Sequence, residues 1–400
     1  MKPVSAGRMR IVVAGHICLD IIPVFPAGRS RGDLLFRPGG LVQVGAALRS
    51  TGGVVSNTGL ALDRLGLPTR LLGKVGDDWI GREILSILRS HGPRLASNMI
   101  VAPGARSSYS IVLSPPGIDR TFLHCPGAND TFAAADVLPG HLRSARLFHF
   151  GYPPVMRRMA GRGGREMALL FRRVLRRGLA TSLDMAGIDD ASEAGRADWV
   201  AWLRNVLPHV DIFLPSFDEI AQMLKPALSG PPTPSGLAGR LLDFGAAMVV
   251  LKLGGEGLYL RTTPDLARLD GLTRAIPLAP GIWRNREMLI PSFRVRVAGT
   301  TGAGDCAIAG FLAALMHGLG PEEALACAAG AGAACVEKPD AVSGIPSWTG
   351  LRHRIRSGWA QNPTDRPLSG WRWDESRRLW RGPGDAGKTP ASSRELVRCA

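Results

Sequence analysis

Cysteine and lysine are both scarce in this sequence. Six cysteines occur in 400 residues, and none stands in the C-x-x-C spacing of paired metal ligands or redox sites. Most lie in apolar runs, which predicts buried, reduced thiols in a cytoplasmic protein. Only six of the 49 basic residues are lysine, so the formal net charge of +16 comes mainly from arginine. Genome base composition alone can produce such a bias, so the charge by itself does not predict nucleic-acid binding.

The excess positive charge is concentrated in two segments. Residues 157–178 hold eight arginines and one glutamate, and residues 351–400 hold eleven basic and five acidic side chains. The first segment contains a single aromatic residue, Phe171, whereas a surface that stacks bases needs several. We therefore expect a solvated helix face and no specific nucleic-acid partner, with weak contact to a polyanion as the alternative.

Long hydrophobic runs are missing, and two common hydrolase functions lack support in the sequence. The apolar stretches at 306–316 and 324–336 are too short to cross a bilayer. His16 and Asp20 interrupt the apolar run near the N-terminus, so we expect neither a signal peptide nor a membrane partner. H-E-x-x-H does not occur, and the G-x-S-x-G match at residues 28–32 lies in an extended, glycine-rich stretch and not in the strand-to-helix turn that a nucleophile elbow needs. Metallohydrolase and serine-hydrolase functions are therefore without support.

One apparent phosphate-binding motif lacks the context that it needs. Residues 382–389 fit the P-loop pattern G-x-x-x-x-G-K-T letter for letter. A working P-loop follows a buried strand and opens a long helix within a parallel sheet. Here Pro390 follows at once, and only eleven residues remain after Thr389. We therefore expect no nucleotide site in this segment.

Short β-branched segments alternate with longer helical patterns through most of the chain. This alternation predicts a three-layer α/β/α fold, with a mostly parallel central sheet and helices on both faces. Ligands of such sheets bind beyond the carboxyl ends of the strands. The predicted strands cover residues 10–18, 69–75, 146–151, 180–185, 211–215 and 247–253, and the predicted helices cover 54–66, 80–91, 163–178, 197–208, 217–225 and 235–245.

Two segments interrupt this alternation, and the end of the chain departs from it. Residues of about 18–45 are extended and glycine-rich, and a hairpin pattern falls within about 105–127, so we expect a small separate β-sheet that forms a lid. From residue 351 the periodicity fades, which suggests one domain at 1–350 and an extension at 351–400. We expect this extension to dock on the domain as far as about residue 385, because it would otherwise expose Trp359, Trp371, Trp373 and Trp380 to water.

The most informative segment is a turn of small residues, Thr300-Thr301-Gly302-Ala303-Gly304-Asp305, which leads directly into an apolar helix. Unpaired backbone N–H groups and the helix dipole suit such a turn to hold a phosphate. A carboxylate is unfavourable beside an anion unless it acts there, for example as the base that takes a proton from an attacking hydroxyl. The turn therefore predicts phosphoryl transfer. The alternative is that Asp305 only complements the helix dipole, an effect of about 0.3–1 kcal/mol.

Five segments, in order, resemble the ribokinase/PfkB carbohydrate kinase family, and the resemblance covers roughly residues 10–350. They are Gly15–Asp20, Gly52–Gly66, Gly73–Gly81, Val250–Gly257 and Thr300–Asp305. The resemblance implies a ribokinase-like fold and an ATP-dependent, Mg²⁺-requiring kinase that phosphorylates a hydroxyl of a sugar or sugar-like alcohol. In that family the position of Asp305 is the general base. The turn that matches Gly302, Ala303 and Gly304 surrounds the transferring phosphoryl group with N–H donors.

The same resemblance assigns the remaining candidate site residues. The substrate-binding positions match Asp20, Gly52, Gly53 and Asn57, and the ATP-binding positions match Thr301, Lys252, Gly254 and Gly257. Glu219 matches a glutamate that places Mg²⁺, usually through water. Ordinary structural roles remain open as well: a turn residue for Asp20, a helix cap for Asn57, an exposed helix residue for Glu219 and a strand-end side chain for Lys252.

Two positions depart from the family pattern. Ser216 stands where asparagine is common, and its hydroxyl can still orient a water. Gly299 stands where the family's turn usually begins with aspartate. That aspartate is linked with monovalent-cation binding, so the glycine argues against potassium activation here.

Two other functions compete with the sugar kinase. One is a nucleoside kinase on the same fold, for which Phe25, Tyr109 and Phe122 are candidate contacts to a base. The other is a catalytically inactive regulator that binds sugar or nucleotide, motivated by Gly299 and Ser216 and by the basic tail. As partners we expect a small sugar-like substrate and ATP, and a homodimer formed through the lid.

Overall fold

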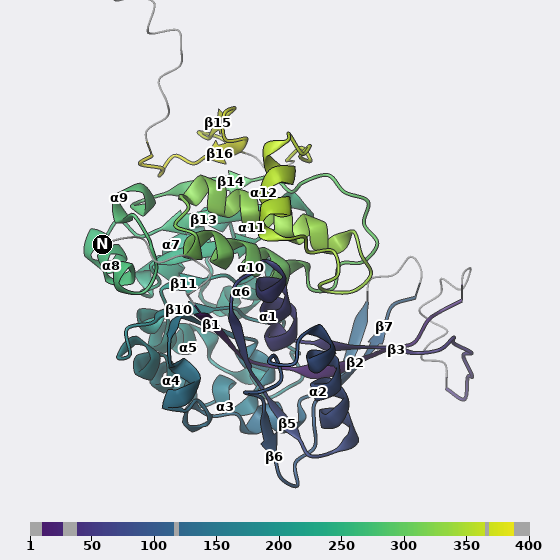
Figure 1. Cartoon of the computed structure of the whole chain (residues 1–400). Helices are drawn as coiled ribbons and strands as arrows, with labels where there is room; N and C mark the ends of the chain where they lie inside the picture. Colours follow the sequence, from purple (N-terminus) through teal and green to yellow (C-terminus); the bar gives the residue numbers. More distant parts are fainter. Residues whose placement is uncertain (1–9, 27–37, 116–119, 365–367, 388–400) are drawn as a thin grey trace, which may run out of the picture.

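The computed structural model describes residues 10–26, 38–115, 120–364 and 368–387, and a ten-stranded sheet forms its centre (Figure 1). Neighbouring strands are parallel from β4 to β12 and antiparallel from β12 to β15. The expected mostly parallel sheet is confirmed, but the antiparallel strands were not predicted. The spatial order is β4 (Thr69–Leu72), β1 (Arg10–Gly15), β9 (Ala145–Gly151), β10 (Ala180–Leu183), β11 (Ile212–Phe213), β12 (Met248–Lys252), β13 (Leu258–Thr262), β14 (Glu287–Ile290), β16 (Leu379–Arg381) and β15 (Arg372–Asp374).

Alternate residues of the central strands enter two hydrophobic cores, one on each face of the sheet. In β1, Ile11 and Val13 enter one core, whereas Val12 and Ala14 enter the other. Successive side chains of a strand point to opposite faces, so a strand that is apolar throughout needs cover on both faces. The first core is covered by α1 (Val54–Arg64), α2 (Trp79–His91), α8 (Leu266–Asp270), α9 (Pro280–Trp283), α10 (Ala303–Met316), α11 (Pro321–Val336) and α12 (Trp348–Arg356). The second is covered by α3 (Arg157–Ala160), α4 (Arg165–Leu175), α5 (Trp199–Val206), α6 (Phe217–Leu224) and α7 (Pro234–Asp243).

A separate four-stranded sheet projects from one side of the molecule, on the right in Figure 1. Its order is β3 (Leu48–Gly52), β2 (Cys18–Ile22), β7 (Tyr109–Leu113) and β8 (Thr121–Cys125), so both expected lid segments contribute strands. We call it the lid sheet. The tip of the hairpin between β7 and β8, residues 116–119, and much of the first segment, residues 27–37, lie outside the described residues.

Two of the predicted strands each cover two strands of the structure. The segment 10–18 is two strands in two different sheets, because β1 ends at Gly15 and β2 begins at Cys18. Gly15 has φ 124°, and a Cβ there would lie 2.4 Å from the carbonyl oxygen of Gly151, so only glycine fits this crossing between the sheets. The segment 69–75 likewise divides into β4 and β5 (Lys74–Gly76), and β5 pairs with β6 (Ile100–Ala102).

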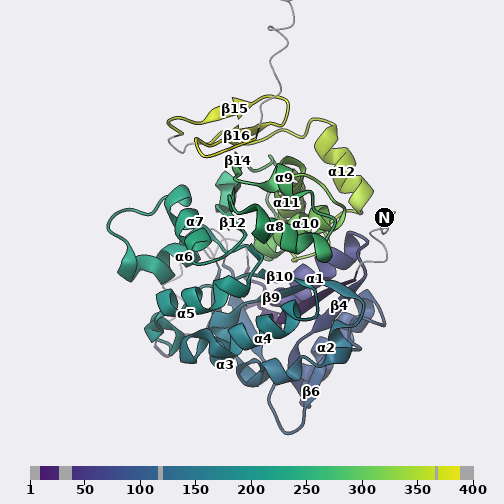
Figure 2. The same ribbon diagram turned by 90° about the vertical axis from the view of Figure 1, so that its left-hand side faces the viewer.

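The C-terminal extension packs on the far edge of the central sheet, at the top of Figure 2. Its strand β16 pairs with β14, and α12 runs across the expected boundary at residue 350. The ring of Trp359 stacks on Phe293, with 4.7 Å between the ring centroids. Arg381, 4% exposed, forms ion pairs with Glu322, Asp374 and Asp385 at 2.8–3.0 Å.

The segment that fits the P-loop pattern serves this packing. The backbone N–H of Gly384 donates to Oε2 of Glu287 at 2.7 Å, and a Cβ at Gly382 would lie 2.5 Å from the same side chain. The loop therefore already holds a carboxylate of β14, where a P-loop would hold phosphate. Lys388 and Thr389 lie outside the described residues.

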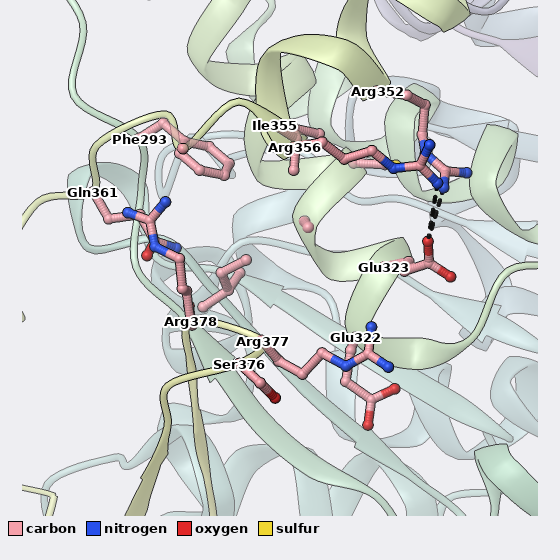
Figure 3. A pocket seen from close by; sticks show the side chains of 14 residues that line it. Phe293, Glu322, Glu323, Arg352, Ile355, Arg356, Gln361, Ser376, Arg377 and Arg378 are labelled. Atoms are coloured by element: carbon pink, nitrogen blue, oxygen red, sulfur yellow. Dashed lines mark hydrogen bonds and ion pairs between the residues drawn. The ribbon is translucent and has the colours of Figure 1, made fainter.

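A cavity of about 340 Å³ lies between α11, α12 and residues 376–378 of the extension (Figure 3). Arg352 and Glu323 line one side of it and form an ion pair of 2.8 Å. None of the predicted site residues lines this cavity. Among the helices of the described segments, none is both long enough and apolar enough to cross a membrane.

Candidate active site

The predicted turn and helix start are present, and they bury Asp305. Gly302 has φ 76° and is the residue immediately before α10, where a Cβ would lie 2.5 Å from Cβ of Ala341. The N–H of Ala303 turns back to the carbonyl oxygen of Thr300 at 3.4 Å. The N–H groups of Gly304 and Asp305, in the first turn of the helix, are therefore the ones that helix geometry leaves for an anion. The side chain of Asp305 is only 3% exposed.

Three donors from two other elements hold the Asp305 carboxylate. Oδ2 accepts from Nδ2 of Asn57 at 3.0 Å and from the hydroxyl of Tyr152 at 2.8 Å, and Oδ1 accepts from the hydroxyl of Thr58 at 3.1 Å. Burial raises the pKa of Asp305, while Lys252 and these donors oppose the rise. Such a carboxylate is held in one orientation and is a stronger proton acceptor than an exposed aspartate.

Tyr152 was not predicted from the sequence. It follows β9 directly and has φ 65°, a left-handed conformation that costs a non-glycine residue about 1–3 kcal/mol. This backbone directs the side chain to Asp305, 153 residues further along the chain. The only signal in the sequence was its place at the carboxyl end of a predicted strand.

A second carboxylate, that of Asp184, was also missed. It follows β10, and its Oδ1 forms an ion pair of 2.7 Å with Nζ of Lys252 at the end of β12. Burial raises the pKa of Asp184 to about 8, although Lys252 lowers it, and the charge of Glu219 raises it further. Its Oδ2 has no hydrogen-bond partner among the described residues, which is unusual for a buried oxygen.

Lys252, which pairs with Asp184, also lies close to the turn that precedes α10. A Cβ at Gly304 would lie 3.3 Å from Cδ of Lys252 and 3.5 Å from Nζ, so the ammonium group lies against the first turn of α10. Glu219 lies in the first turn of α6, where its Oε2 also accepts the backbone N–H of Ser216 at 2.9 Å. The structure therefore brings together Lys252, Glu219 and Asp305, all three predicted, with the unpredicted Asp184.

The lid side of the site contains Asp20 and the glycine pair. Asp20, in β2, is 5% exposed, and burial raises its pKa to about 6. A Cβ at Gly52 would lie 2.3 Å from its carboxylate, and a Cβ at Gly53 would lie 2.5 Å from Nδ1 of His16. Both glycines are therefore required for close packing around Asp20 and His16. Asn57, predicted as a substrate ligand, bonds instead to the predicted base.

The predicted ATP-binding residues differ in how much space surrounds them and in what they contact. Gly254 begins a short turn with φ 59° and open space where a Cβ would be. Gly257 has φ 112°, and a Cβ there would lie 2.0 Å from the carbonyl oxygen of Ile290, so packing alone requires this glycine. The hydroxyl of Thr301 accepts from Nη1 of Arg120 at 3.1 Å, and Arg120 also bonds to Thr300. The lid hairpin thus contacts the turn that precedes α10.

The backbone of Pro339 leaves little space for a side chain at position 299. A Cβ at Gly299 would lie 3.0 Å from Cα and from the carbonyl oxygen of Pro339. An aspartate at this position would require the backbone of Pro339 to move.

A buried carboxylate lies beside a glycine turn, at the carboxyl edge of a parallel sheet that is joined by a separate small lid sheet. This arrangement defines a phosphotransferase of the ribokinase-like fold. The chain belongs to the PfkB family of carbohydrate kinases, because the model of this family, described as pfkB family carbohydrate kinase, matches residues 10–348. It is thus a sugar kinase.

Individual relatives agree with this assignment. An uncharacterised sugar kinase of Archaeoglobus fulgidus is 26% identical over 287 residues, which are 72% of this chain and 98% of that protein. The 2-dehydro-3-deoxygluconokinase of Bacillus subtilis is 26% identical over 319 residues, covering 77% of this chain and 87% of the enzyme. Arabidopsis thaliana ribokinase, solved with ribose and ATP, superposes with a TM-score of 0.64 at 19% identity and covers 87% of this chain and 99% of its own.

The residues present fit ATP and Mg²⁺. Mg²⁺ prefers oxygen ligands, and the unpartnered Oδ2 of buried Asp184 lies in the same charge cluster as Glu219. Lys252 and the free N–H groups of the α10 turn supply the positive side that phosphates require.

Proposed function

We propose that this protein transfers the γ-phosphoryl group of ATP to a hydroxyl of a sugar or sugar-like acceptor, with Asp305 as the general base. The observation that supports this most strongly is the Asp305 carboxylate, which is buried, held by three hydrogen-bond donors and located in the first turn of α10. A carboxylate that only complements a helix dipole needs no such set of donors, since exposure to water would serve it equally well.

The chemistry follows from this arrangement. The acceptor hydroxyl gives its proton to the Asp305 carboxylate as its oxygen bonds to the γ-phosphorus, and the bond from that phosphorus to the β–γ bridging oxygen breaks to release ADP. The N–H groups of Gly304 and Asp305 and the ammonium group of Lys252 stabilise the charge that develops on the transferring group. Mg²⁺, when bound, neutralises phosphate charge, and Asp184 and Glu219 are the residues that would hold it, directly or through water.

Acceptor binding is assigned to the lid side of the site. Asp20 supplies a carboxylate for sugar hydroxyls, and Gly52 and Gly53 let the backbone approach the sugar closely. The relatives' names include kinases of fructose and of 2-dehydro-3-deoxygluconate. A neutral ketose and a deoxy sugar acid are therefore the first acceptors to test.

The test is an ADP-release assay with purified protein, Mg²⁺, ATP and a panel of ketoses, aldoses, 2-keto-3-deoxy sugar acids and nucleosides. With the acceptor that turns over, Asp305→Asn should lower kcat at least about a hundredfold with little change in the affinity for ATP, because a positioned base contributes about 10²–10⁴-fold. The control is Asp198→Asn, since Asp198 caps α5 outside the site and asparagine caps equally well.

The outcomes separate the alternatives. Turnover of nucleosides alone would identify a nucleoside kinase, and binding of sugar or nucleotide without ADP release from any acceptor would identify an inactive regulator. Retained turnover in Asp305→Asn would exclude Asp305 as the base.

A further inference from the structure

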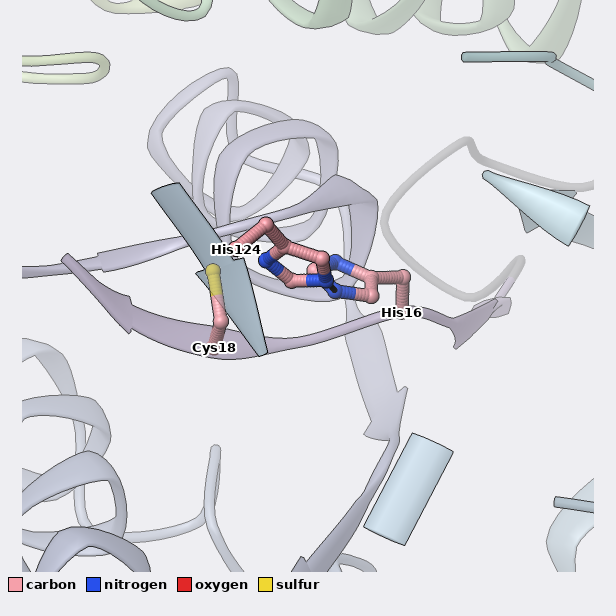
Figure 4. A group of neighbouring side chains, drawn as sticks. All are labelled: His16, Cys18 and His124. Carbon is pink, nitrogen blue, oxygen red and sulfur yellow. Dashed lines mark hydrogen bonds between the residues drawn. The ribbon is translucent and has the colours of Figure 1, made fainter. Parts of the chain in front are cut away.

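Three metal-ligating side chains meet beside the lid sheet, outside the cluster around Asp305. The Nε2 atoms of His16 and His124 are 3.3 Å apart, and Sγ of Cys18 lies close to both (Figure 4). One ligand atom from each of the three residues lies within 4.8 Å of the other two. His16 and Cys18 are each only 3% exposed, whereas His124 is more accessible.

The register of the lid sheet creates this cluster. Asp20 of β2 pairs with Ser110 of β7, and Ser110 pairs with His124 of β8, so the three form one row across the sheet. Cys18 precedes Asp20 by two residues and therefore lies on the same face of β2. Its Sγ is 3.2 Å from Oδ1 of Asp20. A carboxylate therefore lies beside the thiol, although it does not belong to the group of three ligand atoms.

The spacing suits a tetrahedral ion. Two nitrogen ligands at about 2.0–2.1 Å from a tetrahedral Zn²⁺ are about 3.3–3.4 Å apart, which is the separation of the two Nε2 atoms. Ser110 Oγ lies 3.0 Å from Nδ1 of His124, the kind of outer contact that orients a ligating imidazole with Nε2 toward the metal.

We propose that His16, Cys18 and His124 form a binding site for a zinc-type transition-metal ion, with the Asp20 carboxylate beside the thiol. The thiolate and the neighbouring carboxylate together neutralise a divalent cation, so the buried region carries no net charge when the site is filled. A sulfur and two nitrogen ligands select Zn²⁺ or Co²⁺ and disfavour Mg²⁺, which prefers oxygen. The site is therefore distinct from the Mg²⁺ position that we assign to Asp184 and Glu219.

A bound ion would act on the kinase site, a consequence that depends on the proposed function. Asp20 lies beside the ligand Cys18, so the charge of a bound ion attracts its carboxylate and makes it less available to sugar hydroxyls. His16 also stacks on Tyr152, with 6.0 Å between the ring centroids, and Tyr152 donates to Asp305. The ion joins His16, which lies between the two sheets, to strand β8 of the lid sheet. We therefore expect it to inhibit the kinase in competition with the acceptor and not with ATP.

The direct test uses Co²⁺ as a spectroscopic probe of the full-length protein after chelator treatment. One equivalent should produce the visible bands of tetrahedral Co²⁺ and a near-ultraviolet thiolate-to-cobalt charge-transfer band, and one equivalent of Zn²⁺ should remove both. Cys18→Ser, nearly isosteric, should abolish the charge-transfer band. The control is Cys125→Ser, because Cys125 is a free thiol in β8 next to His124 but on the opposite face of the strand.

His124→Gln is a second ligand variant, in a more accessible position, and should weaken Zn²⁺ binding in calorimetry at least about tenfold. The proposal is wrong if the wild-type protein shows no charge-transfer band, or if the band survives Cys18→Ser and disappears in Cys125→Ser.

The kinetic test is separate. Zn²⁺ should raise the KM for the acceptor that turns over and leave the KM for ATP unchanged, and in Cys18→Ser the inhibition constant should rise at least about tenfold. A kinase that binds Co²⁺ through Cys18 without inhibition would overturn the regulatory consequence, and an inactive protein with the same cobalt spectrum would overturn the proposed function while retaining the metal site.

Discussion

Replacing Tyr152 with phenylalanine removes a single hydrogen bond from the predicted base. The Tyr152 hydroxyl donates to Oδ2 of Asp305 at 2.8 Å and is one of the groups that oppose the rise in the pKa of Asp305. A hydrogen bond to a charged group contributes about 1.5–3 kcal/mol, and one pKa unit corresponds to about 1.4 kcal/mol. Tyr152→Phe should therefore raise the pKa of Asp305 by about one to two units.

The consequence appears in the pH dependence of turnover. Asp305 accepts a proton only when it is ionised, so kcat falls as the pH falls through its pKa. In Tyr152→Phe this acid limb should move to higher pH by about one to two units, which lowers kcat about 10–100-fold on the acid side and far less on the alkaline plateau. The measurement is the kcat–pH profile at saturating ATP and acceptor.

A matched control is available in Tyr259, whose buried hydroxyl donates to Oε1 of Glu287 at 2.7 Å and not to Asp305. Tyr259→Phe should lower the free energy of unfolding by about 1.5–3 kcal/mol and leave the kcat–pH profile where it is. If the profile of Tyr152→Phe superimposes on that of the wild type, the hydrogen bond does not set the pKa of the base, and the reasoning fails.

Two further substitutions test the lid glycine and the extension. Gly52→Ala places a Cβ 2.3 Å from the Asp20 carboxylate and should raise the KM for the acceptor but not the KM for ATP. The control Gly140→Ala, with open space around the added Cβ, should change neither KM. If the two variants have equal KM values for the acceptor, Asp20 does not take part in acceptor binding. Arg381→Met removes three ion pairs and leaves buried Asp374 without an ion-pair partner among the described residues, whereas Glu322 and Asp385 keep Arg286, and it should lower the free energy of unfolding by about 3–5 kcal/mol in urea titration. Arg356→Met removes an exposed contact of 4.0 Å and should cost less than about 1 kcal/mol; similar losses in both variants would contradict this difference.

Much of the fold could be predicted from the sequence because its signals are local. Apolar β-branched runs mark the parallel strands, and the glycine turn before an apolar run marks the start of α10 at the right residue. The antiparallel strands β13 and β14 were not predicted, since nothing in their composition distinguishes them from loop segments. The crossing at Gly15 was missed for another reason: its glycine is required by a contact with Gly151, which a local pattern does not contain.

The candidate site was predicted only where a motif was present. Asp305, Lys252 and Glu219 lie in recognisable segments, and the structure brings them together. Tyr152 and Asp184 belong to no motif that we recognised in the sequence, and their importance is visible only in their contacts. The cysteines were expected to be buried, reduced thiols, and Cys18 is a buried free thiol. Its place beside His16 and beside His124, which sheet pairing brings from β8, was not predicted.

The sequence by itself determined the local conformations: which segments become strands, where α10 begins, and that a carboxylate lies in its first turn. Only the tertiary structure decided which groups surround that carboxylate, since Asn57 and Asp305 are 248 residues apart and still form a hydrogen bond of 3.0 Å. The physical reason is that backbone preferences act over a few residues. Strand register and the packing of helices on a sheet, in contrast, fix the positions of side chains across the whole chain.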